Sequence, residues 1–285
     1  MRLTGRRESS NVDDRRGVRI SGKAGAGMGI GGIILVAIIS LLMGANPMDM
    51  LQQMGDMTNV SATAPAELSA EEQELAHFSK QILAGTEDVW AELFKKYGRT
   101  YQNPKLVLFT DQVQTACGGA SSQVGPFYCS ADQSVYLDLS FFSQMRSQLG
   151  ADGDFAYAYV IAHEVGHHVQ YLLGILSRVH SQMSRMSQTE ANKLSVRLEL
   201  QADFFAGVWA HYDNKRFNSL EEGDLDEAIN CASVIGDDYL QKKSRGYVQP
   251  ETFNHGTSEQ RKHWFKLGFE TGDLSQAEKL LPINN

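Results

Sequence analysis

The chain has 285 residues, of which 42% are hydrophobic and 21% are charged, a composition typical of a globular protein. This length accommodates one catalytic domain with short additional segments. The net charge of −8 is unevenly distributed, because residues 1–24 carry seven basic and three acidic side chains and the remainder is strongly acidic. A strongly acidic main domain excludes nucleic acid as its principal partner.

Residues 24–45 contain no charged side chain over 22 positions. At 1.5 Å per residue, a helix of this length spans the hydrocarbon core of a bilayer, about 30 Å. The alternative is a cleaved signal peptide, but the basic leader is long for one, and Met43 stands where cleavage requires a small residue. We therefore predict a retained single-pass anchor, with residues 1–23 as a basic cytoplasmic tail by the positive-inside rule.

The anchor contains overlapping G-x-x-x-G spacings among Gly25, Gly27, Gly29 and Gly31. Such spacings allow two membrane helices to pack closely, so self-association through the anchor is one interpretation. A loosely wound, glycine-rich start of the helix is the other, and the sequence leaves both open.

Residues 46–68 are rich in Met, Gln, Thr, Ala and Pro without steady periodicity, which is typical of a linker. The folded domain, residues 69–285, is expected to begin where Ser69 and Glu72 form a capping box before an apolar-periodic helix. We expect this helix to break near Gly85, because glycine is a poor helix former.

Two β-like runs, residues 105–109 and 134–139, follow the first helix, and apolar periodicity predicts further helices after them. The expected helices cover approximately residues 69–97, 140–149, 153–174, 188–213, 224–243 and 257–272. This order predicts a predominantly helical α+β fold, with a small sheet ahead of the main helices and a single transmembrane helix before the domain.

The chain has three cysteines, and no two of them form a C-x-x-C pair that would indicate a metal site. Cys117 and Cys129 bracket a short segment that contains glycine and proline, and we expect them to form a disulfide if the domain is exported. Cys231 lies in an apolar helical stretch and is predicted to be a buried thiol.

The strongest chemical signal is the sequence AHEVGHHVQ at residues 162–170, which contains His163, Glu164 and His167 as a His-Glu-x-x-His motif. Residues four apart share one face of a helix, so the two imidazoles can bind one zinc ion. Glu164 can then direct its carboxylate at a water on the open coordination position. Gly166 costs a helix interior about 0.5–1 kcal/mol relative to alanine, so we expect a backbone or a substrate to approach closely there.

A second predicted helix offers a third ligand. Glu199 and Asp203 are four residues apart and face one way, 32 residues after the motif. If the two helices cross, Glu199 becomes the third zinc ligand and leaves the fourth position for water. Asp203 can then accept a hydrogen bond from a ligand imidazole and fix its orientation.

The run at residues 134–139 precedes the metal helix, and we expect its edge to be exposed and to pair with an extended peptide. Tyr136 or Asp138 would line that cleft, unless they are ordinary alternating strand residues. His168 is expected to point away from the metal and to be a packed or surface histidine. Ordinary roles are expected for His77, His180, His211 and His263.

These motifs resemble those of the gluzincins, HExxH metallopeptidases whose third ligand is a glutamate in an E-x-x-x-D helix. The closer similarity is to the bacterial family of putative neutral zinc metallopeptidases, which join a basic tail and a single anchor to the catalytic domain. Their characteristic runs are found here at residues 116–118, 125–129, 135–138, 162–170, 199–203 and 255–261. The resemblance covers nearly the whole chain. It implies a zincin-like domain in which His163, His167 and Glu199 bind one Zn²⁺ and Glu164 is the catalytic acid/base.

The sequence HGTSEQR at residues 255–261 also resembles a segment of the CAAX-processing and related membrane metallopeptidases. By that analogy, His255 stabilises the transition-state oxyanion and Arg261 orients the site. The alternative is an ordinary helix start, in which Thr257 or Ser258 caps the helix and Arg261 pairs with an acid. Both interpretations remain open at this point.

Together these features predict a zinc metallopeptidase anchored in the bacterial inner membrane, with its domain on the periplasmic side and a peptide or protein as substrate. Zinc would activate a water molecule and polarise the scissile carbonyl, and Glu164 would act as general base and then general acid. Two alternatives are a catalytically minor envelope-binding or quality-control module and a zinc amidase that acts on the cell wall.

Overall fold

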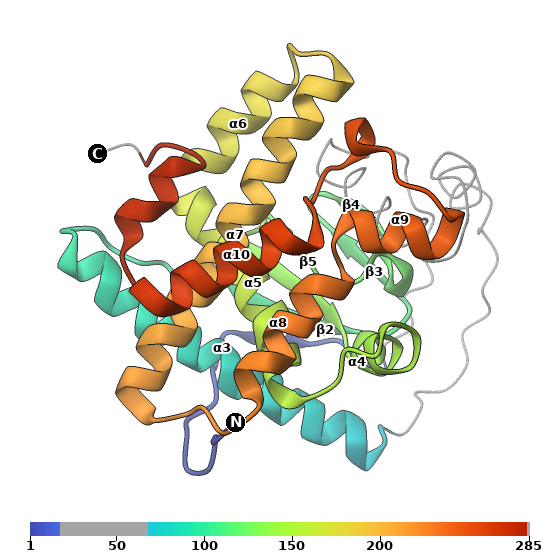
Figure 1. Cartoon of the computed structure of the whole chain (residues 1–285). Coiled ribbons are helices and arrows are strands. Elements are labelled where there is room, and N and C mark those ends of the chain that lie inside the picture. Colours follow the sequence, from blue (N-terminus) through green and yellow to red (C-terminus); the bar gives the residue numbers. More distant parts are fainter. Residues whose placement is uncertain (18–67, 284–285) are drawn as a thin grey trace.

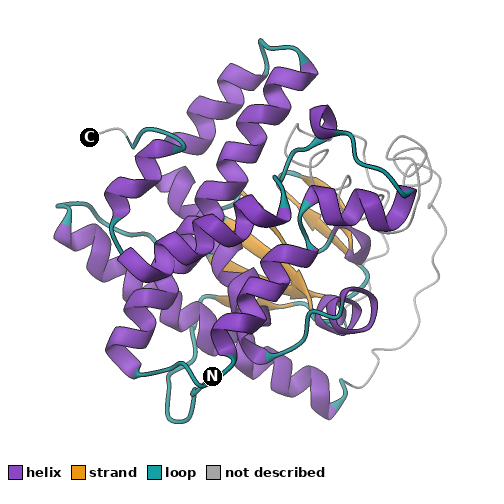
Figure 2. Cartoon of the chain, in the orientation of Figure 1, coloured by secondary structure: helices purple, strands orange, loops and turns teal. Residues whose placement is uncertain are grey.

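The computed structural model describes residues 1–17 and 68–283, in which helices surround a small sheet (Figures 1 and 2). The prediction of a predominantly helical α+β fold is confirmed. No helix in these two ranges is long and apolar enough to cross a membrane. The predicted anchor, residues 24–45, and nearly all of the predicted linker lie outside the described residues.

The main sheet has four strands in the order β1-β2-β6-β5. Strands β1 (Val12–Asp14), β2 (Lys105–Phe109) and β6 (Ser134–Asp138) are parallel, and β5 (Phe127–Cys129) is antiparallel to β6. Strand β6 therefore has a hydrogen-bonded neighbour on each side. The prediction that it offers an exposed edge to a substrate is wrong, because β5 and β1 occupy the two edges.

The two residues that were expected to line a cleft on β6 have structural roles instead. Tyr136 is buried and donates a hydrogen bond to Asp132. The Asp138 carboxylate accepts hydrogen bonds from the backbone N–H groups of Asp111 and Ser140 at the end of the strand. Both side chains therefore stabilise the sheet and its turns.

Both faces of β2 are buried, which explains its continuous apolar sequence. Leu106 and Leu108 face the main core with the helices, whereas Val107 and Phe109 face a second, smaller core. That smaller core is formed with a hairpin of β3 (Gln112–Thr115) and β4 (Gly118–Ser121) and the short helix η1 (Ser122–Val124). The predicted disulfide between Cys117 and Cys129 is present and links the hairpin turn to β5.

Helix α3 (Ala70–Lys96) begins with the predicted capping box at Ser69, but the predicted break near Gly85 is wrong. A Cβ atom at Gly85 would lie 2.6 Å from Arg6 Nη2 and 2.9 Å from Asp213 Oδ1. The glycine therefore leaves room for an ion pair against an unbroken helix. Local propensity could not show this, because both partners are distant in the sequence.

The remaining helices follow the predicted order, with differences in their number and limits. They are α4 (Ser140–Gln144), the π-helix η2 (Met145–Leu149), α5 (Asp154–Leu172), α6 (Ile175–Met183), α7 (Gln188–Phe217), α8 (Asp224–Val234), α9 (Asp237–Arg245), η3 (Pro250–Thr252), α10 (Ser258–Thr271) and η4 (Leu274–Lys279). Helices α6, η3 and η4 were not predicted, and α7 extends past residue 213. The predicted helix 224–243 is two helices that meet at Gly236, where a Cβ would lie 2.3 Å from the backbone nitrogen of Ser258.

Helices α7 and α10 cross in close contact near the centre of the molecule (Figure 1). Gly207 and Gly268 make this approach possible, since a Cβ at either position would lie 2.1 Å from a carbonyl oxygen of the other helix. The contact brings the N-terminal half of α10 against the part of α7 that carries the predicted third ligand.

Residues 1–17 belong to the folded domain, so the prediction that they form a separate tail, with the domain beginning at Ser69, is incorrect for these residues. They supply β1, which pairs with β2 from Val12 opposite Leu106 to Asp14 opposite Leu108. Of the basic residues that suggested a solvated tail, Arg2, Arg6 and Arg7 are paired with acids beyond residue 69, and Arg15 and Arg16 are paired with acids of the same segment. A count of charges along the sequence does not reveal such partners.

Candidate metal centre

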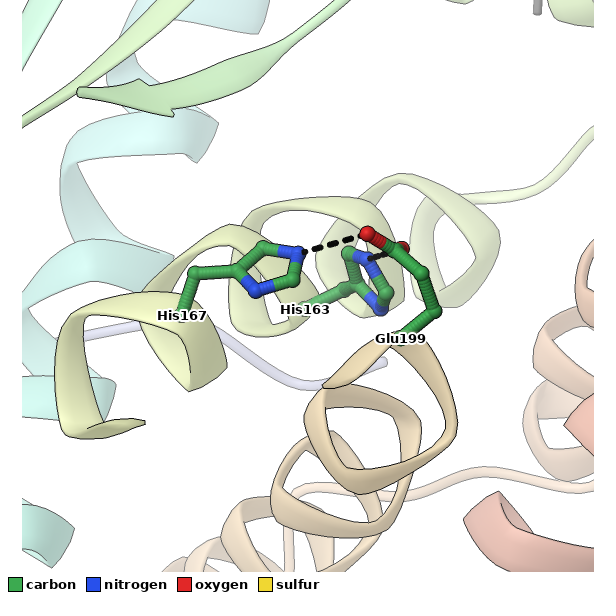
Figure 3. Close-up of side chains that lie close together, drawn as sticks. All are labelled: His163, His167 and Glu199. Atoms are coloured by element: carbon green, nitrogen blue, oxygen red, sulfur yellow. Dashed lines mark hydrogen bonds and ion pairs between the residues drawn. The ribbon is translucent and has the colours of Figure 1, made fainter. Parts of the chain in front are cut away.

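The three predicted ligands converge from two crossing helices (Figure 3). His163 and His167 lie one turn apart on α5, and Glu199 projects from α7 toward both imidazoles. Each contributes a ligand atom, and these atoms all lie within 4.8 Å of one another. Glu199 Oε2 is 3.2 Å from His163 Nε2, and Glu199 Oε1 is 3.5 Å from His167 Nε2.

Gly166 makes this crossing possible, as its position within the motif suggested. A Cβ atom at Gly166 would lie 2.9 Å from the carbonyl oxygen and 3.1 Å from the Cα atom of Ala202. The backbones of α5 and α7 therefore touch within one turn of the ligands. The predicted close approach is confirmed, and its partner is a backbone of the same chain.

The charges of the site favour a bound cation. Burial alone would raise the pKa of Glu199, but the neighbouring imidazoles of His167 and His163 hold it well below its ordinary value. Burial would likewise lower the pKa of His163, but Asp203 and Glu199 raise it to about 10. The carboxylates of Glu199 and Asp203 thus stabilise positive charge at this buried site, and a bound cation would take the place of the protons on the imidazoles.

Asp203 orients the first ligand, as predicted. Its Oδ1 atom lies 2.8 Å from His163 Nδ1, which leaves Nε2 on the side of Glu199. The same carboxylate accepts hydrogen bonds from Arg261 Nε at 2.8 Å and Nη2 at 2.9 Å, and from the hydroxyl of Tyr159 at 2.5 Å. Although burial raises the pKa of Asp203, Arg261 and His163 lower it to about 2, so this carboxylate stays ionised.

Gln170 orients the second predicted ligand, His167, a role that the sequence did not predict. Its Oε1 atom lies 2.9 Å from Nδ1 of His167, and its Nε2 donates to the carbonyl of Leu198 at 2.7 Å. Gln170 follows His167 by three residues and therefore shares its helix face. That spacing could have indicated the contact from the sequence. Only the structure shows that the carbonyl of Leu198 on α7 holds the Gln170 amide in place.

Glu164 lies beside the ligands and is 7% exposed. Burial raises its pKa, and the nearby Glu199 carboxylate adds to the increase, whereas the two imidazoles oppose it. A carboxyl group with a raised pKa is suited to take up a proton and release it again near neutral pH. This is the property that the general acid/base role requires.

His255 is held in a loop against α7. Asp237 Oδ1 lies 3.2 Å from its Nδ1, and Oδ2 of the same carboxylate accepts the N–H groups of residues 254–256 at 2.7–2.9 Å. A Cβ atom at Gly256 would lie 3.1 Å from Leu200, the neighbour of Glu199. The Nε2 atom of His255 is buried and has no hydrogen-bond partner, and the ring lowers the pKa of Glu199.

Both interpretations of the segment at residues 255–261 are partly realised. Thr257 caps α10 in a capping box with Gln260, as an ordinary helix start requires. Arg261 pairs with an acid, and that acid is Asp203, which orients a ligand. The arginine therefore orients the site through its ion pair, without contact with the metal ligands themselves.

The other histidines lie outside the ligand set, as predicted. His168 is fully buried between the hydroxyl of Tyr128 and the carbonyl of Gln102, so it is a packed core residue. Burial lowers its pKa to about 4. The predicted buried thiol, Cys231, is also confirmed.

The donor set fits zinc. Two imidazoles and a carboxylate are the ligands of catalytic zinc sites that keep a fourth position for water, whereas structural zinc sites use four protein ligands. Within the described residues, the group that holds His163 and His167 has Glu199 as its one carboxylate and no fourth member. The orienting partners Asp203 and Gln170 complete the arrangement that imidazole ligands of metals require.

The chain is similar to proteins of bacteria. The chain is 50% identical over 283 residues to the Escherichia coli K12 protein named "Uncharacterized protein YpfJ", with 97% of each chain covered. It is 43% identical over 195 residues to "Uncharacterized protein Rv2575" of Mycobacterium tuberculosis H37Rv, covering 65% of this chain and 64% of that protein. No solved structure matches. The model of the family described as "Putative neutral zinc metallopeptidase" matches residues 1–280, and the chain belongs to this family.

Proposed function

We propose that this protein is a zinc-dependent endopeptidase that binds one Zn²⁺ through His163, His167 and Glu199. The observation that carries the proposal is the convergence of these ligand atoms within 4.8 Å beside the buried carboxyl group of Glu164. A purely structural metal site would have no use for that carboxyl group. When bound, zinc supplies Lewis acidity that activates water and polarises a peptide carbonyl.

Glu164 would provide the proton transfers. Its burial raises its pKa, so it can accept a proton from the attacking water and deliver it to the leaving amine. With a proton on each ring nitrogen, His255 would donate from Nδ1 to Asp237 and from Nε2 to the oxyanion that develops during attack. The hydrogen bond of its Nδ1 to Asp237 fixes the ring, and Nε2 is the ring nitrogen left without a partner.

An extended substrate would pair with β5 instead of β6. Strand β5 is an edge strand of the main sheet, and its residue Tyr128 contacts His168, the neighbour of His167. An edge strand offers unpaired backbone groups that can form hydrogen bonds with the main chain of an extended peptide.

We also propose that the domain works outside the cytoplasm, attached to the inner membrane through residues 24–45. The disulfide between Cys117 and Cys129 supports this placement, because such bonds persist in oxidising compartments and are rare in the cytosol.

Substrate trapping with Glu164→Gln tests the proposed reaction. The variant is expected to retain one zinc per chain, measured by elemental analysis, to lose peptide hydrolysis, and to co-purify with uncleaved protein substrates. Glu199→Ala is expected to lose zinc, whereas Glu190→Ala, an exposed glutamate on the same helix, keeps it. Full activity of Glu164→Gln, or enrichment of cell-wall fragments in place of proteins, would overturn the peptidase assignment.

A further inference from the structure

Residues 1–17 are integrated into the catalytic domain through backbone hydrogen bonds. The N–H of Leu106 on β2 donates to the carbonyl of Asn11 at 2.9 Å, and the N–H of Arg15 donates to the carbonyl of Leu108 at 2.8 Å. The N–H of Ser9 reaches the carbonyl of Lys80 on α3 at 3.0 Å. Strand β1 therefore completes one edge of the main sheet.

Buried ion pairs hold the same segment. Arg6 donates to Asp213 on α7 at 2.9 Å, and the two side chains are 9% and 1% exposed. The domain has a glycine at residue 85 of α3, where any side chain would collide with this pair. Asp213 is therefore paired with an arginine that precedes residues 24–45 in the sequence, whereas Asp213 itself follows them.

A second buried carboxylate depends on the same segment. Glu87 on α3 is 4% exposed and accepts hydrogen bonds from Arg7 at 2.9 Å, from Ser9 at 2.6 Å and from Asn11 at 2.7 Å. All three donors come from residues 1–17. Without them, Glu87 and Asp213 would be buried charges without counterions, a state that folded proteins avoid.

We infer that residues 1–17 lie on the same side of the membrane as the catalytic domain. A single crossing by residues 24–45 would place the two parts on opposite sides and would separate Arg6 from Asp213 and Ser9 from Glu87. Because residues 1–17 pack with residues 68–283 in one folded unit, the two parts share one side of any membrane to which the protein is attached. This topology replaces the arrangement, predicted from the sequence, of a cytoplasmic N-terminus and an external domain.

The charge count that suggested a cytoplasmic N-terminus has a different meaning in the folded protein. Five of the arginines before the apolar segment are ion-paired: Arg2 with Glu221, Arg6 with Asp213, Arg7 with Asp88, Arg15 with Asp13, and Arg16 with Asp14. Three of these acids belong to the domain beyond residue 69. Arg2, Arg6 and Arg7 therefore serve as counterions for acids of the domain, whereas Arg15 and Arg16 pair within the segment.

Cysteine labelling in intact membranes tests the inference. Ser10→Cys and Ser181→Cys each place one exposed thiol, in the N-terminal segment and on α6 respectively. The native cysteines are either paired or buried, and the parent chain measures their background. Each variant is treated with a membrane-impermeant maleimide on intact spheroplasts and again after permeabilisation.

The inference expects the two thiols to behave alike. Labelling of both before permeabilisation supports it together with the external location of the domain. Labelling of both only after permeabilisation supports the shared side and contradicts the external location. If Ser181→Cys is labelled on intact spheroplasts and Ser10→Cys only after permeabilisation, the chain crosses once and the inference is wrong.

Thermal stability in intact cells provides an independent measurement. Arg6→Ala is expected to lower the aggregation temperature of the domain by several degrees, because Asp213 loses its buried partner. Arg2→Ala, which removes an exposed pair at 3.4 Å, is expected to change it little. Equal aggregation temperatures for Arg6→Ala and the parent chain would show that the segment is not docked in the cell, and would overturn the inference.

Discussion

Asp203 on α7 lies 2.8 Å from His163 Nδ1 on α5, so the residue that follows the third ligand by one helical turn fixes the first ligand. The relationship links the two helices of the metal centre by a side-chain contact as well as by the backbone approach at Gly166. It makes the geometry of His163 dependent on α7 and, through Arg261, on α10.

Asp203→Asn is expected to weaken zinc binding by about 10–100-fold, the usual effect of losing a residue that orients a metal ligand. The amide keeps the shape of the carboxylate but not its charge, and it can present a donor to His163 where the acceptor was. Competition with a chromogenic chelator measures the affinity. Glu190→Gln is the control on the same helix, and equal affinities for the two variants would contradict the orienting role.

Gly166→Ala is expected to destabilise the protein and to disturb the metal centre, although alanine is the better helix former. The new methyl group would lie 2.9 Å from the carbonyl oxygen of Ala202, so α5 and α7 must separate. We expect a loss of about 1–3 kcal/mol in the free energy of unfolding, as for other overpacked sites. Urea unfolding of the zinc-free protein measures it.

Two reference variants are unfolded in urea in the same way, to give a small and a large expected loss of stability. Ser181→Ala lies on the surface of α6 and is expected to be nearly neutral. Gly268→Ala would place its Cβ 2.1 Å from the carbonyl of Phe204 and is expected to cost more than Gly166→Ala. A gain of stability in Gly166→Ala would mean that helix propensity, and not the crossing, decides at this position.

His255→Ala is expected to reduce kcat by about 10²–10³-fold, the usual cost of removing an oxyanion donor. Zinc content and KM should stay near those of the parent chain, because Nε2 of His255 would bind the substrate oxygen only when negative charge develops on it in the transition state. Asp237→Asn should reproduce part of the loss. If kcat per folded molecule is unchanged and only the melting temperature falls, His255 has a packing role alone.

His168 predicts a pH dependence of stability. Burial lowers its pKa to about 4 in the folded protein, whereas a histidine in the unfolded chain titrates near 6.5. Between these values the unfolded chain binds more protons, so the stability contributed by neutral His168 is complete above pH 6.5 and is lost as the pH falls toward 4. The full difference amounts to about 3 kcal/mol.

Urea unfolding at pH 7 and pH 5 of the parent chain and of His168→Gln measures this contribution. The parent chain should lose about 2 kcal/mol more than the variant between the two pH values, since the other histidines are common to both. Parallel losses in the two proteins would show that His168 is already protonated, or equally accessible, in the fold.

Much of the metal centre could be predicted from the sequence, because its spacing is local. His163 and His167 must share a face of any helix that contains them, and the same holds for Glu199 and Asp203. The capping box at Ser69 and the apolar runs of β2 and β6 depend likewise on neighbours a few residues away. Short-range geometry therefore determined the predicted ligands, the candidate general base and the main elements.

Only the tertiary structure decided which segments meet. It made β6 an internal strand, set Gln170 against a carbonyl of α7, brought Asp237 to His255, and turned a basic leader into β1 and the counterions of Asp213 and Glu87. Sheet order, helix crossings and buried ion pairs join residues that are distant in the chain. The periodicity and charge count of one segment carry no information about its distant partner, and for that reason the place of residues 1–17 in the sheet could be read only from the folded molecule.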